Sequence, residues 1–471
     1  MNRVNAVVVK DLRHLQAVPS EYCRRTETDL SPYLPKAEQI IKAVREFGDE
    51  ALITYGRQLD RVNAEKFALR VTPEEFDAAE AAVSQELKAA ISFATDNIRR
   101  FHEAQSPKEM WIKEMHPGAF AGERCVPIDS VACYVPSGNG SFPSVLMMTA
   151  IPAVVAGVRR VVVITPPGPD GQVDAGTLVA AQTVGIKEVY KCGGAQGVAA
   201  VAYGTQSVPR CAKIVGPGSH WVAAAKRLLR DVIDSGVPAG PNECLILADA
   251  MADGQLLALD LAIESETAPD CSAYLVTDSP EVAYLAARSL PERWSNMNCP
   301  RAQSSRGVLS GPHGGILLVK DFETAIRFVN DYAPERLAIH AADPMAVLSR
   351  ITNAAGVLLG PHTPAGIGNF VLGPNAVLPT SRFARTASPL TVHDFVKRTS
   401  FGYVTAAGYA QLAQHAEVLA RYEGSPGHAN AIFKDRPDHL RRIAHETHMR
   451  EDLISERRWQ AAQALCTTNQ D

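Results

Sequence analysis

The chain has 471 residues, of which 46% are hydrophobic and 21% charged, so it is long enough for two to four globular domains with a large buried core. No apolar run reaches the roughly 18 residues that a membrane span requires, the first residues lack the apolar region of a secretory leader, and the net charge of -4 argues against a nucleic-acid partner. The nine cysteines are scattered without a C-x-x-C pair, so we expect reduced thiols in a cytoplasmic protein.

The N-terminal part of the chain is expected to be helical. Apolar residues between Leu34 and Phe47 recur near the 3.6-residue period of a helix. The sequence TPEE at residues 72–75 offers a threonine cap, a proline for the first turn and a glutamate that can bond back to the cap. This pattern predicts a helix that begins there and extends to about Gln105.

A first series of short β-branched runs follows, each ending in a glycine-containing turn before a helix of small residues. The turns read PSGNG, TPPGPDG, CGGAQG and GPGS. Repeated strand, glycine turn and helix predict a parallel sheet with crossover helices, and ligands of such sheets bind at the carboxyl edge, which these turns form. The predicted strands are residues 131–135, 161–164, 188–191 and 212–215.

A second series predicts another α/β unit, and beyond about Ala384 the pattern becomes helical. The chain ends in a charged segment near residues 436–463, which we expect to lie on a surface or to reach a partner subunit. We expect an N-terminal extension over 1–30, a first α/β domain from 31–130 and 242–384, a cofactor domain at 131–241 and a helical dimerisation segment at 385–471. The predicted strands of the second series are residues 244–247, 273–276, 315–319, 337–339 and 357–359.

A complete G-x-G-x-x-G fingerprint is absent, and the fragment that begins at Gly138 is weak evidence alone. Two explanations of the glycine turns are about equally good: that they bind a nucleotide, or that they only allow the helices to pack on the parallel sheet. More specific are eight motifs that stand in order between Ile98 and Ile432. They read IRRFHEAQ, YVPSGNGSFPSVLMMTAIPAVVAGV, GGAQGVAAVAYGTQSVP, KIVGPG, PAGPNE, NDYAPE, NAVLPT and HANAI.

These motifs resemble the histidinol dehydrogenase family in residues and in order. The resemblance implies an α/β fold of two Rossmann-like parallel-sheet domains with helical N- and C-terminal extensions. It also implies a homodimer that exchanges domains and uses NAD to oxidise a primary amino alcohol to the aldehyde and then the acid, with one zinc ion per active site. The cofactor residues that it implies are Tyr134, Pro136, Gly138, Gln196, Gly218 and Ser219. The alternative is that Tyr134 only ends a strand and Gln196 only caps a helix.

The metal site implied by the resemblance is altered in this chain. The family binds zinc through glutamine, histidine, aspartate and a distant histidine, and the matching positions here are Glu264, Thr267, Asn369 and His428. A threonine hydroxyl and an asparagine amide are poor zinc ligands, so we expect that zinc is absent. The alternative is a weaker metal site in which Glu264 replaces the missing carboxylate and a water molecule fills the gap.

The substrate site implied by the resemblance is altered as well. Asn242 stands where the family has a serine, Ala376 and Arg336 stand where it has histidines, and Glu335 and Glu423 are retained. A guanidinium cannot relay a proton near neutrality. Arg336 is therefore interpreted as an anchor for an anionic substrate, as a counter-charge that keeps Glu335 ionised, or as a surface residue of a diverged loop.

The function predicted is NAD-dependent oxidation of a small alcohol other than histidinol, which could be an amino alcohol or an anionic alcohol, in a specialised metabolic pathway. Glu335 is the expected general base, and His428, from the other subunit of a homodimer with shared active sites, is the second candidate. The substrate-binding residues expected beside them are Asn242, Glu264, Thr267, Arg336, Asn369, Ala376 and Glu423. The alternatives are a histidinol dehydrogenase with a diverged site and an inactive NAD-binding or scaffolding protein. No nucleic-acid or membrane partner is expected.

Overall fold

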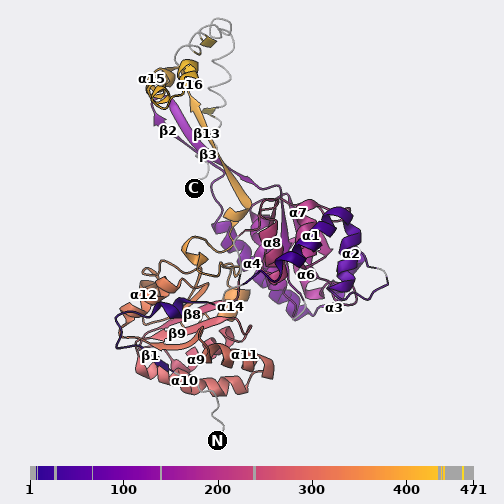
Figure 1. Ribbon diagram of the computed structural model, residues 1–471, viewed down its shortest axis with the longest axis vertical. Helices are drawn as coiled ribbons and strands as arrows, with labels where there is room; N and C mark the ends of the chain where they lie inside the picture. The colour runs from indigo at the N-terminus through magenta and orange to yellow at the C-terminus, as the bar shows by residue number, and fades with distance from the viewer. Residues whose placement is uncertain are drawn as a thin grey trace. The chain divides into compact units, whose positions relative to one another are not determined.

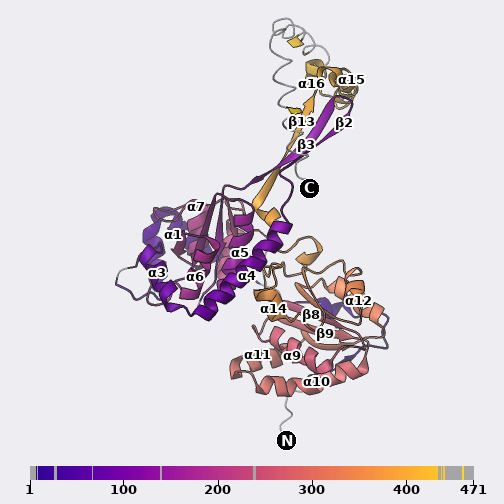
Figure 2. The same ribbon diagram turned by 180° about the vertical axis from the view of Figure 1, so that it is seen from behind.

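The computed structural model divides the chain into two compact units, which are described separately. Unit 1 comprises Met1–Ser106 and Ile128–Phe395, and unit 2 comprises Pro107–Pro127 and Val396–Asp471. Figures 1 and 2 show the elements of both units. The structure describes residues 7, 9–25, 29–65, 67–137, 140–236, 240–432, 436, 439–440 and 459–460.

The first sheet of unit 1 has four parallel strands in the order β6-β5-β4-β7, the parallel α/β pattern that the glycine turns predict. Its strands are buried on both faces, as expected when crossover helices cover a parallel sheet. All four predicted strands are confirmed within one or two residues at each end. The elements are β4 (Ser130–Tyr134), α5 (Pro143–Val155), β5 (Arg160–Thr165), α6 (Ala175–Val184), β6 (Val189–Lys191), α7 (Gly194–Tyr203), β7 (Lys213–Val215) and α8 (His220–Leu228).

The N-terminal helices pack on this four-stranded sheet. One face carries α3 and α4 beside α5 and α6, and the other carries α1 and α2 beside α7 and α8. The apolar faces of these helices are thus buried against β4 to β7, and the predicted division of the chain into domains stays a prediction. The capping box of Thr72 and Glu75 is confirmed, although its helix ends at Ala82 and a new one begins after Ser84. The helices are α1 (Leu34–Phe47), α2 (Asp49–Gln58), α3 (Pro73–Ala82) and α4 (Gln85–Ala104).

The second sheet of unit 1 has six parallel strands in the order β1-β10-β9-β8-β11-β12. The five predicted strands are confirmed, whereas β1 (Val9–Asp11), which pairs with β10, was not predicted. Helices α9 to α11 cover one face and α12 covers the other (Figure 1), where α13 also packs. The elements are η1 (Ser20–Cys23), β8 (Glu243–Ala248), α9 (Gly254–Glu264), β9 (Ser272–Thr277), α10 (Pro280–Ser295), α11 (Cys299–Ser310), β10 (Gly314–Leu318), α12 (Phe322–Tyr332), β11 (Arg336–His340), α13 (Pro344–Leu348), β12 (Gly356–Leu359), α14 (Ala365–Phe370), η2 (Phe383–Arg385) and η3 (Val392–Phe395).

Unit 2 is built on an antiparallel sheet in the order β13-β3-β2, followed by two helices. The prediction that the chain beyond Ala384 is helical is wrong for β13, whose residues are nearly all exposed or half-buried and so lack an alternating apolar pattern. Most of the charged segment at 436–463 lies outside the described residues, but Trp459 packs against Phe120 and Tyr403. The elements are β2 (Met110–His116), β3 (Ala119–Pro127), β13 (Val396–Val404), α15 (Ala406–Tyr422) and α16 (Pro426–Asn430).

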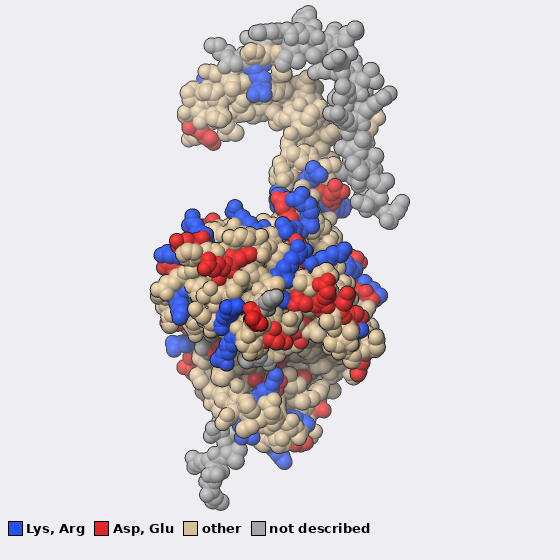
Figure 3. All heavy atoms as spheres, turned by 90° about the vertical axis from the view of Figure 1, so that its right-hand side faces the viewer, with Lys and Arg blue, Asp and Glu red and all other residues tan. Residues whose placement is uncertain are grey.

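Among the described residues, none of the helices has both the length and the apolar character needed to cross a membrane. On the face shown in Figure 3, basic and acidic side chains are interspersed, as the nearly balanced counts of 47 basic and 51 acidic residues lead one to expect.

Candidate active site

A cleft with a volume of about 460 Å³ lies at the carboxyl edge of the four-stranded sheet, where ligands of parallel sheets bind. It contains four of the six predicted cofactor residues, namely Tyr134, Pro136, Gln196 and Ser219. Gly218 lines a neighbouring cavity, and Gly138 lies outside the described residues. The lining residues are Lys36, Ile40, Leu59, Asp60, Tyr134, Pro136, Ser137, Pro166, Pro167, Gly194, Ala195, Gln196, Ser219 and Trp221.

Tyr134 links the end of β4 to the start of α7. Its side chain is 3% exposed, and its hydroxyl accepts a hydrogen bond of 3.0 Å from the backbone N–H of Gly194. The first N–H groups of a helix lack partners within the helix, so this bond satisfies one of them. Tyr134 thus fixes the helix start that forms the cleft wall, in addition to lining the cleft.

Gln196 and Asp60 form a polar pair in the same cleft. The Gln196 Nε2 donates to Asp60 Oδ2 over 3.2 Å, whereas Gln196 Oε1 is buried and has no partner among the described residues. Burial raises the pKa of Asp60 to about 6. An unpaired acceptor and a carboxylate fit the hydroxyl groups of a ribose, so this cleft fits a dinucleotide cofactor. Asp60 was not predicted, because it follows α2, 136 positions before Gln196, and no glycine motif marks it.

The predicted general base Glu335 lies at the amino edge of the six-stranded sheet, just before β11 and beside the start of β8. The register places Arg336 beside Cys244, and therefore Glu335 beside Glu243. Glu335 is 7% exposed, and its Oε2 accepts a 2.9 Å hydrogen bond from the backbone N–H of Glu243. Burial raises the pKa of Glu335 to about 7, against the opposing effect of Arg336. Glu335 can therefore exist in both protonation states near neutrality.

Glu243 supports this carboxylate and was itself missed by the sequence analysis. Its Oε1 accepts from Arg25 Nε over 2.6 Å and from the backbone N–H of Ser381 over 2.7 Å. Its Oε2 is buried without a partner among the described residues, and burial raises its pKa. Arg25 also donates to the carbonyl groups of Tyr332 and Ala333, at the end of α12, just before Glu335. Two carboxylates and one guanidinium thus occupy one buried cluster.

Arg336 points away from this cluster, because successive side chains of a strand alternate between faces. Its guanidinium donates to Glu264 Oε2 over 3.1 Å, at the end of α9 on the opposite face of the sheet. The interpretation of Arg336 as a surface residue is wrong, since it is 9% exposed and begins a central strand. Burial raises the pKa of Glu335, and the charge of Arg336 lowers it in the direction expected of a counter-charge without cancelling the effect of burial.

The residues at the family's metal positions do not form a fitting set of zinc ligands in unit 1. The Glu264 carboxylate faces the Arg336 guanidinium, and Asn242 Nδ2 donates to the Glu264 backbone carbonyl over 3.1 Å. A metal ion on this carboxylate would meet a fixed positive charge, and Thr267 and Asn369 offer only weak neutral oxygen ligands. Within the described part of the chain, no group of three His, Cys, Asp or Glu side chains could hold a metal ion.

The remaining predicted residues lie in separate places. Ala376 packs against the apolar cluster of the four-stranded sheet, next to Asn375, whose Nδ2 donates to the Met148 carbonyl over 2.7 Å. Glu423 and His428 belong to unit 2, where both are exposed, after α15 and in α16 respectively.

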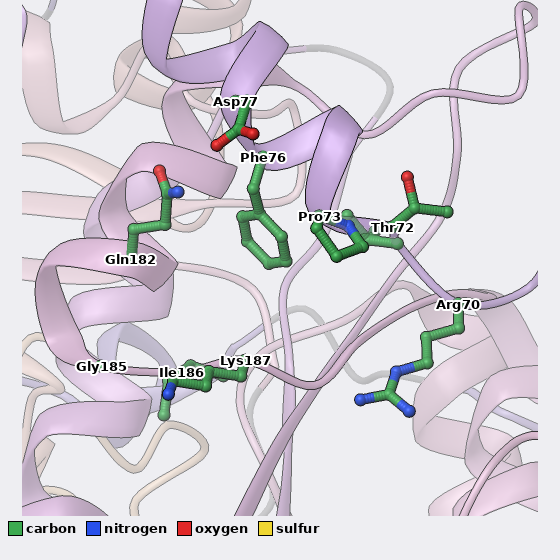
Figure 4. Close-up of a pocket in the computed structure, with 10 residues that line it drawn as sticks. Arg70, Thr72, Pro73, Phe76, Asp77, Gln182, Gly185, Ile186 and Lys187 are labelled. Atoms are coloured by element: carbon green, nitrogen blue, oxygen red, sulfur yellow. The ribbon is translucent and has the colours of Figure 1, made fainter.

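Another cavity, of about 730 Å³, lies at the amino edge of the four-stranded sheet and contains none of the predicted residues. Figure 4 shows Phe76 over its centre, with Arg70 and Lys187 at its rim. It is open and mainly apolar, and it faces away from the glycine turns. We therefore assign the cofactor cleft to the carboxyl edge.

The fold and the cleft define a parallel α/β protein with a ligand cleft at the carboxyl edge of one sheet. The family model described as histidinol dehydrogenase matches residues 23–435, and the chain belongs to this family. A protein of Mesorhizobium japonicum named histidinol dehydrogenase homolog 2 is 56% identical over 91% of this chain and 98% of its own length. A Synechocystis histidinol dehydrogenase is 44% identical over 87% of this chain and 94% of its own length. The crystal structure of histidinol dehydrogenase from Elizabethkingia anophelis superposes with a TM-score of 0.86, at 28% identity over 92% of this chain and 98% of that one.

Proposed function

We propose that the protein oxidises a small alcohol other than histidinol to the aldehyde or ketone, with NAD as acceptor and without zinc. The observation that carries this proposal is the buried Glu335, whose pKa of about 7 suits a general base, combined with Arg336 bound to Glu264 at the altered metal position. A second oxidation of an aldehyde to the acid could use the same carboxylate to activate water.

The proposed reaction uses the cleft at the carboxyl edge of the four-stranded sheet and Glu335 at the amino edge of the six-stranded sheet. NAD, when bound, supplies the acceptor for the hydride that leaves the alcohol carbon. Gln196 and Asp60 hold the cofactor by its hydroxyl groups, and Tyr134 fixes the wall beside it. Glu335 takes the hydroxyl proton as the hydride departs, and the N–H of Glu243 keeps its carboxylate oriented. Because an alcohol is a far weaker acid than any carboxylic acid, proton removal must accompany hydride departure.

The proposal includes a homodimer with shared active sites, in which His428 and Glu423 come from the partner subunit. Support comes from helix α15 of unit 2, where Val418, Leu419 and Tyr422 are 63%, 61% and 90% exposed. These apolar side chains lie at helical spacing on one stripe, which is typical of a surface that contacts another protein. His428 would then be the second candidate base, and Glu423 a group that binds an amine.

The altered residues support a substrate other than histidinol. Thr267, Asn369 and Ala376 replace groups that the family uses, and the Arg336 guanidinium is bound to Glu264. The relatives at 51–58% identity carry names that include the word homolog, while those named simply histidinol dehydrogenase are at 38–44%. The second candidate, a histidinol dehydrogenase with a diverged site, rests on the 44% identity to the Synechocystis protein of that name.

The test measures NADH formation with a panel of neutral, amino and anionic alcohols, with histidinol included. We expect turnover of at least one alcohol, none with histidinol, and a roughly 10²- to 10⁴-fold lower kcat for Glu335→Gln. Glu38→Gln, which removes an exposed carboxylate on α1, serves as the matched control and should keep wild-type activity. Complementation of a histidine auxotroph would favour the second candidate, and NAD binding without turnover of any alcohol would favour an inactive scaffold.

A further inference from the structure

A separate cavity of about 400 Å³ lies beside helix α8, between the glycine turn after β7 and the loops that lead to β8. One side of α8 contributes Val222, Ala223 and Lys226 to its wall. The cavity is not used by the proposed reaction. Its lining residues are Leu30, Gly216, Gly218, Val222, Ala223, Lys226, Arg227, Arg230, Ser235, Gly236, Gly240, Thr380 and Ser381.

Every charged residue in this lining is a cation: Lys226, Arg227 and Arg230. Among the described residues, no carboxylate lies within 4.0 Å of Lys226 or Arg227, and Arg230 has only an exposed pair with Asp231 at 3.6 Å. The cavity therefore concentrates positive charge that the protein itself does not neutralise. Such a lining attracts an anion, because opposite charges in a partly desolvated cavity interact more strongly than in water.

Lys226 is the half-buried member of this set, whereas Arg227 and Arg230 are exposed. Its Nζ donates to the Gly216 carbonyl over 2.7 Å, which uses one of its three N–H groups. Burial lowers its pKa to about 8, and no neighbouring carboxylate opposes the effect. A desolvated ammonium with two unused donors is costly unless a ligand completes it. The bond to Gly216 holds the ammonium beside the glycine turn after β7. Gly216 and Gly218 of this turn both line the cavity.

The opposite wall reaches the acid–base cluster. Thr380 Oγ1 accepts from the backbone N–H of Gly240, and the N–H of Ser381 donates to Glu243 Oε1 over 2.7 Å. Glu243 in turn supports Glu335. The cavity thus lies between a predicted cofactor turn and the residues next to the proposed base. The hydroxyl groups of Thr380 and Ser381 add neutral donors to the three cations.

We propose that this cavity binds a phosphate-type oxyanion through Lys226, Arg227 and Arg230. The oxyanion could be the diphosphate of a bound dinucleotide or an anionic group on the substrate, since both present the same charged oxygens. The inference does not require that the alcohol oxidation proposed above be correct, because it concerns anion binding alone.

The test is calorimetric titration of the full-length protein with inorganic pyrophosphate at constant ionic strength and pH 7. We expect saturable binding at one site per chain, at least tenfold weaker in Lys226→Met, as for loss of a hydrogen bond to a charged group. Lys42→Met removes an exposed lysine paired with Glu38 and should bind like the wild type. Equal affinity in the wild type and Lys226→Met, or no saturable binding to the wild type, overturns the proposal.

The pH dependence of the wild type gives a second readout, which does not depend on the folding of a variant. The titratable groups that line the cavity with Lys226 are Arg227, in α8, and Arg230, just after α8. Both stay charged, and the other lining residues contribute none. Affinity should therefore fall as pH rises above about 8 and Lys226 loses its charge. An affinity that stays constant from pH 7 to 9.5 overturns the assignment to Lys226.

A competition experiment identifies the source of the oxyanion. Displacement of NADH fluorescence by pyrophosphate assigns the site to the diphosphate of the cofactor. Simultaneous binding of both assigns it to the substrate's anionic group, and the preferred alcohols should then carry a negative charge. If the protein binds pyrophosphate but oxidises no alcohol, the oxyanion site stands and the proposed function fails.

Discussion

At the scale of single residues, the position of two carboxylates governs the candidate chemistry. Glu335 and Glu243 lie side by side at the starts of two neighbouring strands, on the same face of the sheet, and Arg25 compensates only one of them. Burial disfavours the charged form of a carboxyl group, and the charge of Arg336 only partly opposes this effect, so the pKa of Glu335 rises to about 7. Arg336, one position later, points to the other face.

The raised pKa of Glu335 has a consequence for stability. The folded protein holds this proton more tightly than the unfolded chain, so folding loses stability as pH rises from about 4.5 to about 7. We expect Glu335→Gln, which cannot ionise, to be more stable than the wild type at pH 8 by on the order of 1–3 kcal/mol, and to have little advantage at pH 4.5. Denaturant unfolding at both pH values measures this. A Glu335→Gln protein less stable than wild type at pH 8 contradicts the assigned shift.

The polar pair in the cleft predicts a separate effect on the cofactor. Gln196→Ala removes the buried, unpaired Oε1 and also the hydrogen bond from Nε2 to Asp60. Asp60→Asn removes the negative charge of the carboxylate. Each should raise the KM for NAD about tenfold or more, since groups that hydrogen-bond hydroxyls contribute roughly 1–2 kcal/mol, and leave the KM for the alcohol unchanged. Steady-state kinetics in both substrates separates the two. Equal changes in both constants would indicate a folding role instead.

The ion pair of Glu264 and Arg336 predicts that activity does not require zinc. Protein purified without metal-affinity resin should contain well below one zinc per chain, and prolonged chelation should leave turnover unchanged, because the best carboxylate at the altered position is already paired with a cation. Metal analysis and activity before and after chelation provide the measurement. Stoichiometric zinc, together with activity that is lost on chelation and regained on zinc addition, would favour the weaker metal site centred on Glu264.

At the scale of elements, the sequence predicts the strands that are determined by a local pattern of residues. Nine strands of the two parallel sheets follow from β-branched runs bounded by glycine turns. The antiparallel sheet of unit 2 was missed, because neither face of β13 is buried and its register depends on pairing with β3, 269 to 285 positions earlier in the chain. Asp60, Arg25 and Glu243 were missed for a related reason, since each acquires its role from a partner far away in sequence.

The turn between β2 and β3 provides an element-scale prediction. Gly118 has a φ of +73°, and a Cβ there would collide with Thr405 Oγ1 and approach the Gly408 N to 2.9 Å. Gly118→Ala should therefore destabilise unit 2 by about 2 kcal/mol or more, through backbone strain and steric overlap together. Gly424→Ala is the matched control, because Gly424 has a φ of +72° and open space around its Cβ position. Limited proteolysis should cleave Gly118→Ala faster, and equal cleavage of the two variants would contradict the steric argument.

At the scale of the whole molecule, the candidate catalytic groups are divided between the two units. Glu335 belongs to unit 1, whereas His428 and Glu423 belong to unit 2 and are exposed there. Exposed ionisable side chains on a unit with an unpaired apolar stripe suit a site that is completed by another chain. Because of this division, the proposed dimer can be tested by measuring enzymatic activity, and not only by measuring the molecular mass of the assembly.

Mixing two inactive variants tests the shared site. If each active site uses Glu335 of one chain and His428 of the other, then a heterodimer of Glu335→Gln and His428→Ala contains one site with both defects and one with neither. Random exchange makes about half of the dimers heterodimers, so a 1:1 mixture should recover about a quarter of the wild-type activity per site, by the symmetry of a two-fold dimer. The measurement is NADH formation after subunit exchange, with exchange verified by mass spectrometry of differently tagged chains. Glu335→Gln mixed with itself is the control and should stay inactive. If exchange is complete and the mixture of the two variants is as inactive as either alone, each chain builds its site from its own residues, and His428 acts beside the Glu335 of its own chain or not at all.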